Sequence, residues 1–384
     1  MSSVLFWVAL VTLILTVLAA VDLLIGNRSV PALRDVSPEA AGDPPRVSLI
    51  VAARNEERHI RAAVESMLGL SYPNYEIIAV DDRSDDQTGA LLNELARRHT
   101  RLKVIHIDAL PAGWLGKNHA LWVGSQRATG EIFLFTDADI YMEKTVLTRA
   151  VAFLKERRLG HLAVTPSLQM PTLFLSMFGA AFAIYFSLFS RPWKAKDPNS
   201  RSHIGIGAFN MVTAEAYQRV EGHQAIRLRP DDDIKLGKVL KLAGFRADVA
   251  YAPEYLSVEW YDSLRAVVKG LEKNAFSGAD YSIPLVLAGV VFHTLCSIWP
   301  FVAVWVTTGY VQWINLAVVA LIMLAAADTA RFHGSRPWYA IGYPVTSAFF
   351  VYILLRTMTL NLIQGGIYWR GTFYSLKELR ANRV

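Results

Sequence analysis

The chain has 384 residues, of which 53% are hydrophobic, and its mean hydropathy is +0.28. It is too apolar for an ordinary soluble domain, whereas its 19% of charged residues exclude a protein that lies wholly within a membrane. No RNP, zinc-finger or helix-turn-helix pattern accompanies the net charge of +6, so we expect no nucleic acid partner and infer attraction to an anionic membrane surface. The single cysteine, Cys296, excludes a disulfide within the chain.

Residues 4–25 form an apolar run with one charge, Asp22. The run is long enough to span a hydrocarbon core, which needs about 20 residues, so we expect a transmembrane anchor. A cleaved signal peptide is the alternative, but the first three residues lack the usual basic region. Arg28, Arg34 and Arg46 follow the run, and the positive-inside rule then places the next domain in the cytoplasm.

Strand-like and helix-like segments alternate through the following region. Strands are predicted at 47–53, 75–80, 102–107, 131–136 and 161–166, and helices near 57–68, 86–98 and 117–128. Strands separated by helices of this length form βαβ units, so residues 46–280 should form one α/β domain with a mostly parallel sheet.

Three clusters of aspartates mark this domain: Asp81-Asp82, Asp137-Ala138-Asp139 and Asp231-Asp232-Asp233. The first two follow predicted strands, and open α/β sheets bind ligands at the carboxyl ends of their strands. Any one cluster could consist of turn formers or helix caps. The crowding of all three favours a site for a divalent cation, Mg²⁺ or Mn²⁺, together with a bound phosphate.

The segment 172–190 carries no charge. If it crossed the membrane, the second and third acidic clusters would lie on opposite sides and could not share a site. We therefore expect a helix in the membrane interface, with basic residues such as Arg191 and Lys194 at headgroup level. A buried core helix is the alternative.

Three further apolar stretches, about 283–308, 312–329 and 338–362, predict a C-terminal transmembrane region over 283–362, followed by a basic tail, 363–384. The prediction is a multi-pass protein of a bacterial-type cell membrane. Four spans with the N-terminus outside would also place the basic tail outside, against the positive-inside rule. Either the last stretch, broken by Gly342 and Pro344, is re-entrant, or the tail is an exception.

Four segments resemble, in order and spacing, the family 2 glycosyltransferases with a GT-A fold. They are VSLIVAARNEE (47–57), YPNYEIIAVDDRSDDQT (72–88), PAGWLGKNHAL (111–121) and ATGEIFLFTDADI (128–140). The resemblance covers about residues 46–280. It is strongest to the membrane-bound branch that glycosylates lipids, which includes ceramide glucosyltransferases, hopene-associated glycosyltransferases and carotenoid glycosyltransferases.

The resemblance implies a site for a nucleotide-sugar donor. Ala53, Arg54 and Glu56 would border the base, Asp81 or Asp82 would accept a hydrogen bond from uracil, Lys117 would face the diphosphate, Asp137 the ribose and the metal, and Asp139 the metal. A metal and a lysine suit a leaving diphosphate, because both stabilise its developing charge. Alternatively, Lys117 is an exposed helix residue and Arg54 a surface ion-pair partner.

The third cluster opens DDDIKLGKVLKLAGF, where the resemblance places the general base at Asp233 and an acidic residue before it at Asp232. Such a base deprotonates the acceptor hydroxyl in a single displacement that inverts the anomer. The aspartates could instead only stabilise a helix N-terminus. HIGIGAFNMV (203–212) resembles the acceptor loop, with Gly207 and Asn210 as candidate contacts, although Asn210 could equally be a turn residue.

The sequence departs from the family after the base. A Gln/Arg-x-x-Arg-Trp pattern is expected there, but the chain reads GLEKN (270–274), in which Lys273 keeps a positive charge and the Trp is absent. This disfavours a processive polysaccharide synthase. A lipid flippase or transport subunit would need ionisable residues within its spans, and the terminal stretches contain only His293, Asp328 and Arg356. The prediction is transfer of one sugar, from a UDP-sugar, to a membrane lipid.

Overall fold

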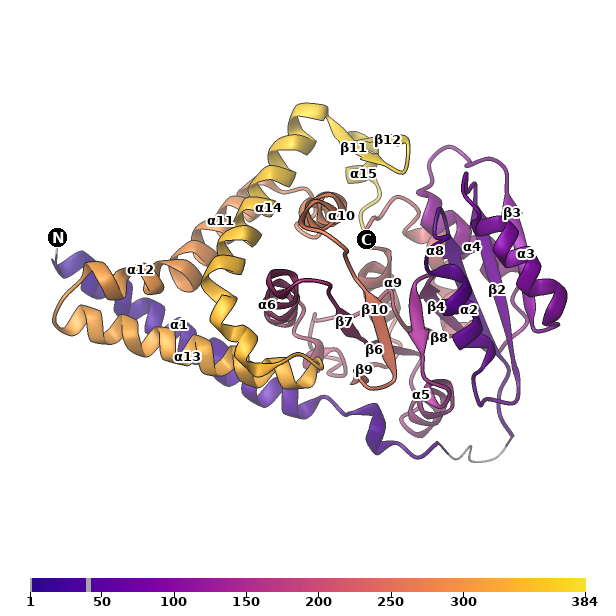
Figure 1. Cartoon of the computed structure of the whole chain (residues 1–384), viewed down its shortest axis with the longest axis horizontal. Coiled ribbons are helices and arrows are strands. Elements are labelled where there is room, and N and C mark those ends of the chain that lie inside the picture. Colours follow the sequence, from indigo (N-terminus) through magenta and orange to yellow (C-terminus); the bar gives the residue numbers. More distant parts are fainter. Residues whose placement is uncertain (1, 39–42) are drawn as a thin grey trace. The chain divides into compact units, whose positions relative to one another are not determined.

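The structure is a computed structural model that describes residues 2–38 and 43–384 (Figure 1). The chain forms two compact units. The sheet unit contains residues 30–167, 192–259 and 381–384, and the helical unit contains the residues up to Ser29, 168–191 and 260–380. Residues 260–280 therefore cluster with the helices rather than with the sheet.

A seven-stranded sheet with the order β3-β2-β1-β4-β8-β6-β9 organises the sheet unit (Figure 1). Its strands are β1 (Val47–Ala53), β2 (Tyr75–Asp82), β3 (Leu102–Ile107), β4 (Ile132–Asp137), β6 (His161–Thr165), β8 (Asn210–Thr213) and β9 (Ala247–Tyr251). Every neighbouring pair is parallel except those of β8, which runs antiparallel to both β4 and β6. The predicted mostly parallel α/β sheet is confirmed.

Helices of this unit follow the strands, as βαβ units require. They are α2 (Ile60–Leu68), α3 (Thr88–Arg98), α4 (Gly116–Arg127), α5 (Val146–Glu156), α7 (Ala214–Arg219), α8 (Gly222–Ala225) and α9 (Asp232–Leu242). β2 is buried along its whole length, as expected for a parallel strand covered on both faces. α4 packs closely on the sheet, since a Cβ added at Gly124 would lie 2.5 Å from the side chain of Ile50. Outside this sheet, β5 (Ile140–Met142) and β10 (Leu256–Glu259) pair antiparallel.

Long apolar helices dominate the helical unit. They are α1 (Ser2–Ser29), α6 (Leu173–Ser190), α10 (Leu264–Ser277), α11 (Ile283–His293), α12 (Trp299–Val306), α13 (Tyr310–Phe332) and α14 (Tyr343–Gln364). A π-helical turn, Thr294–Ile298, joins α11 to α12. A hairpin of β11 (Gly366–Trp369) and β12 (Thr372–Ser375) and the helix α15 (Leu376–Ala381) follow.

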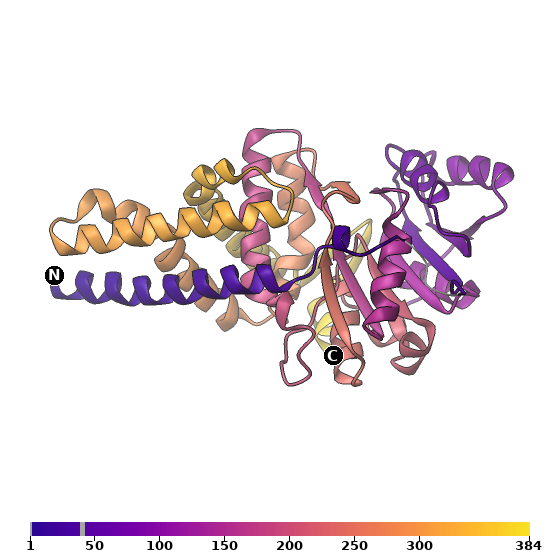
Figure 2. The same ribbon diagram turned by 90° about the horizontal axis from the view of Figure 1, so that it is seen from below.

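Five helical segments within the described residues are long and apolar enough to cross a membrane: Ser3–Ser29, Leu173–Lys194, Ile283–Val306, Tyr310–Phe332 and Pro337–Gln364. α1 and α13 lie side by side (Figure 2), and Arg28 donates two hydrogen bonds, of 2.7 and 2.8 Å, to the carboxylate of Asp328. α6 packs through the buried Phe178 against α10 and α14. The helices predicted at both termini are confirmed.

Candidate active site

The carboxyl ends of β1, β2 and β4 meet at one edge of the sheet. Ala53, at the end of β1, pairs with Asp81 on β2, and Ala52 pairs with Asp137 on β4. The register of these three parallel strands therefore brings the first two acidic clusters to the same edge, as the strand pattern predicts.

Lys117 joins the second acidic cluster to the third. It lies in the first turn of α4, and its Nζ is 2.8 Å from Oδ1 of Asp137 and 3.3 Å from Oδ2 of Asp232. Burial alone would lower the pKa of this lysine, but the neighbouring aspartates outweigh burial and raise the pKa above its ordinary value. Lys117 is therefore a stable positive charge between two groups of carboxylates.

A small pocket in the sheet unit brings together residues predicted to bind the donor, to contact the acceptor and to act as the base. The residues that line it include Lys117, Asp137, Gly207, Asn210, Asp232 and Asp233. Leu121 and Phe135 contribute apolar surface, and Thr136 and His223 also line the pocket. Residues expected to contact the donor, the acceptor and the transferred proton thus line one cavity.

Asp233 is held by two main-chain amides. Its Oδ2 accepts a hydrogen bond of 2.8 Å from the N–H of Gly207, and its Oδ1 accepts one of 2.8 Å from the N–H of Ile234. Burial, reinforced by the charge of Asp232, raises the pKa of Asp233 to about 7. A carboxylate with such a pKa is well suited to accept a proton at neutral pH.

The candidate acceptor loop approaches these carboxylates with its main chain. A Cβ added at Gly207 would lie 2.7 Å from Oδ2 of Asp137, so only glycine fits without displacing that side chain. Asn210 is buried, and its side-chain amide contacts Nε2 of His161 at 2.6 Å and donates to the main-chain oxygen of Asp233 at 3.4 Å. Asn210 therefore supports the residue expected to be the base.

Asp139 has the chemistry of a cation ligand. Its Oδ1 is buried and, within the described residues, accepts no hydrogen bond. Burial, followed by the charges of Asp137 and Glu56, raises the pKa of Asp139 to about 7. A bound cation would favour the ionised carboxylate of Asp139, because it supplies a partner for Oδ1 and opposes the neighbouring negative charges.

No group of three or more His, Cys, Asp or Glu side chains in residues 2–38 and 43–384 is arranged to hold a metal by itself. Mg²⁺ is commonly bound by one or two carboxylates together with substrate phosphates. Asp139 and Asp137 fit that mode of binding, in which the donor completes the coordination.

The candidate base-binding residues lie at and just beyond the carboxyl ends of β1 and β2, at the same edge of the sheet. Asp82 forms a bidentate pair with Arg83, at 2.7 and 3.0 Å, and lies 4.0 Å from Arg54. Oδ2 of Asp81 lies 2.9 Å from Nδ1 of His106. Both carboxylates are therefore oriented by neighbouring cations or by an imidazole. Glu56 is held through its main-chain N–H, which donates to Oγ1 of Thr88.

Lys273 is not among the residues that line the pocket. It lies on α10 in the helical unit, where its Nζ is 4.0 Å from the centre of the Trp369 ring, a cation–π geometry. The lysine after the base segment therefore meets a tryptophan from the C-terminal hairpin, which the local sequence around Lys273 does not predict.

Sequence reasoning missed the buried ion pair that precedes the base. Arg229 is 1% exposed and donates to both carboxylate oxygens of Asp231, at 3.1 and 3.2 Å. Of the third cluster, Asp231 is thus occupied by a structural partner, whereas Asp232 and Asp233 line the pocket. The type of Arg229 gives no signal of its burial, because arginine is mostly exposed in folded proteins.

Residues 48–216 match the family model described as glycosyl transferase family 2. The chain carries a domain of this family, as the four sequence segments predict, and the protein is a transferase enzyme.

Among known proteins, the chain is similar to the 4,4'-diaponeurosporenoate glycosyltransferase of Staphylococcus aureus. The protein of strain USA300 is 21% identical over 339 residues, which cover 86% of this chain and 89% of the relative. The solved structure of the mannosyltransferase PcManGT from Pyrobaculum calidifontis, in complex with GDP-Man and Mn²⁺, aligns with a TM-score of 0.56 and 19% identity. That alignment covers 94% of this chain and 99% of PcManGT, and it shows a common fold.

Proposed function

We propose that the protein is an inverting glycosyltransferase that moves one sugar from a UDP-sugar to a hydroxyl group of a membrane lipid. One observation carries the proposal. Lys117 contacts both Asp137, on the expected donor side, and Asp232, next to the expected base. The group that would stabilise the leaving diphosphate therefore lies beside the group that would deprotonate the acceptor.

Asp233 would remove the proton of the acceptor hydroxyl as its oxygen attacks the anomeric carbon. The bond between the sugar and the diphosphate breaks as the new bond forms, so the anomeric configuration inverts. Lys117 would stabilise the negative charge that develops on the diphosphate. A divalent cation held by Asp139 and Asp137 would supply further stabilisation of that charge when bound.

For the donor base we propose uracil, with Asp81 or Asp82 accepting from its imide N–H and with Ala53, Arg54 and Glu56 along its border. Guanine offers an N–H to the same carboxylates, and the solved mannosyltransferase structure is a complex with GDP-Man. Thermal stabilisation by UDP and by GDP, each with Mn²⁺, distinguishes the two donors. Greater stabilisation by GDP would overturn this part of the proposal.

Two features support a lipid acceptor. The described helices include five that could cross a membrane, and the staphylococcal relative is named for a carotenoid acid.

The name of that relative denotes a carboxylate acceptor, which carries no proton at neutral pH and needs no base. Asp232 and Asp233 would repel such an acceptor. The presence of a base with a pKa of about 7 therefore favours a hydroxyl.

The connections of α6 support a sheet unit that lies on one side of the membrane. β6, before α6, and β8, after it, pair within a single sheet. Both ends of α6 must therefore return to the same side, which supports an interfacial or packed helix rather than a crossing one. The arginines that follow α1 favour the cytoplasmic side.

The test is transfer itself. The purified protein in lipid nanodiscs would receive radiolabelled UDP-sugars, Mn²⁺ and a lipid extract of its host membrane, and the organic phase would be analysed. The proposal predicts a labelled lipid with an inverted, alkali-stable glycosidic bond. An alkali-labile ester product would show a carboxylate acceptor, and an elongating water-soluble polymer would show a polysaccharide synthase.

A further inference from the structure

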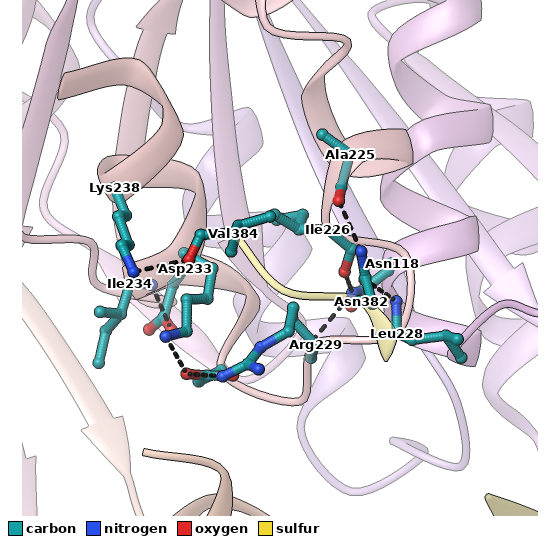
Figure 3. Close-up of polar contacts among 12 residues, drawn as sticks. Asn118, Ala225, Ile226, Leu228, Arg229, Asp233, Ile234, Lys238, Asn382 and Val384 are labelled. Atoms are coloured by element: carbon teal, nitrogen blue, oxygen red, sulfur yellow. Dashed lines mark hydrogen bonds and ion pairs between the residues drawn. The ribbon is translucent and has the colours of Figure 1, made fainter. Parts of the chain in front are cut away.

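The loop before Asp233, residues 226–231, is hydrogen-bonded to Asn382. Residues 226–231 connect α8 to α9 and carry the buried pair of Arg229 and Asp231. On one side, Nδ2 of Asn118 in α4 donates to the main-chain oxygens of Ile226 and Arg229, at 2.7 and 3.0 Å. The other side is held by Asn382 (Figure 3).

Asn382 makes two hydrogen bonds across this loop. Its Oδ1 accepts from the N–H of Leu228 at 2.9 Å, and its Nδ2 donates to the main-chain oxygen of Ala225 at 2.9 Å. Leu228 is 8% exposed. A buried main-chain N–H requires a partner, and Asn382 provides it from a segment distant in sequence.

The same segment also holds α9, the helix that begins with Asp232 and Asp233. Nζ of Lys238 donates to the main-chain oxygen of Val384 at 2.6 Å. The Val384 side chain packs on the core cluster that includes Leu236 and Leu240 of α9. Residues 382–384 therefore contact the chain both before and after the base.

We propose that Asn382 is a positioning residue for Asp233, which it orients by fixing the loop 226–231 between α4 and the C-terminal segment. The proposal rests on the proposed role of Asp233 as the base. Asn382 touches neither donor nor acceptor, since it is not among the residues that line the pocket. Its effect should therefore fall on the chemical step.

The sharpest variant is Asn382→Asp, which keeps the shape of the side chain but replaces the N–H donor by an oxygen facing the carbonyl of Ala225. It should lower kcat about tenfold, the equivalent of one net hydrogen bond, and leave the KM for the donor unchanged. Asn382→Ala should lose at least as much, and Asn382→Gln, which retains both hydrogen-bonding groups, should recover most of the loss.

Arg383→Ala is the matched control, because Arg383 is the exposed neighbour of Asn382 in the same segment. It should leave kcat unchanged. UDP binding and the melting temperature, measured for every variant, separate positioning from loss of folded protein. Wild-type kcat in Asn382→Asp would overturn the proposal, as would equal losses in the Ala and Gln variants. Asp233→Asn in the same assay tests the base separately, so failure of the proposed function is recognised independently.

Discussion

The Nζ of Lys117 lies 3.3 Å from Oδ2 of Asp232, although the two residues stand on different helices, α4 and α9. This contact joins the proposed donor side of the pocket to the segment that contains the proposed base, Asp233.

Lys117→Met should reduce kcat by about 10²- to 10³-fold, the loss typical when one preorganised donor to a developing anion is removed. Methionine preserves most of the volume while removing the charge. Lys144→Ala, at an exposed lysine outside the pocket, serves as the control. Steady-state turnover with a saturating donor is the measurement, and activity within a factor of two of wild type would contradict the role of Lys117.

Asp139→Ala should abolish Mn²⁺-dependent binding of UDP, because it removes the carboxylate whose Oδ1 is buried without a hydrogen-bond partner among the described residues. Isothermal titration calorimetry of UDP with and without Mn²⁺ measures the effect. Asp108→Ala, at an exposed aspartate, should bind as the wild type does. Unchanged affinity in Asp139→Ala would exclude this residue as the cation ligand.

The pH dependence of kcat should show a single acidic limb with a midpoint of about 7, because burial and Asp232 raise the pKa of Asp233 to that value. Below the midpoint the base is protonated and inactive, so kcat should fall as the pH falls. If kcat stays constant from about pH 5 to about pH 8, no group with this pKa controls the chemical step.

The strands and the first two acidic clusters could be predicted because their signals are local. The strand-like runs VSLIVAA and LKVIHI predicted β1 and β3 with the observed bounds, 47–53 and 102–107. β8 has only four residues and inserts antiparallel between β4 and β6. Its place depends on pairing between distant segments, for which one sequence carries no pattern.

The residues that hold the site in shape could not be predicted from the sequence either. Asn382 and Leu228 are 154 positions apart, and their hydrogen bond exists only after the chain has folded. The residues next to Arg229 and His161 in the sequence likewise do not indicate that these two side chains are buried. Their burial follows from tertiary packing. Residue types and spacing thus predict the chemistry of a pocket better than the residues that hold it in shape.

The sheet unit should face the cytoplasm. In a Cys296→Ser background, cysteine introduced at the exposed Arg127 should resist a membrane-impermeant maleimide in intact cells and react after permeabilisation. Cysteine introduced at Ser3, the first residue of the first candidate span, should react in intact cells. The reverse pattern of labelling would invert the proposed topology.

Turnover of Asp233→Asn in lipid nanodiscs tests whether Asp233 is the general base of sugar transfer. Asparagine can still accept the hydrogen bond from Gly207 but cannot take a proton, so UDP-sugar binding should remain while kcat for the lipid product falls at least about 10²-fold. Wild-type turnover in this variant would show that Asp233 is not the base and would make Asp232 the first candidate.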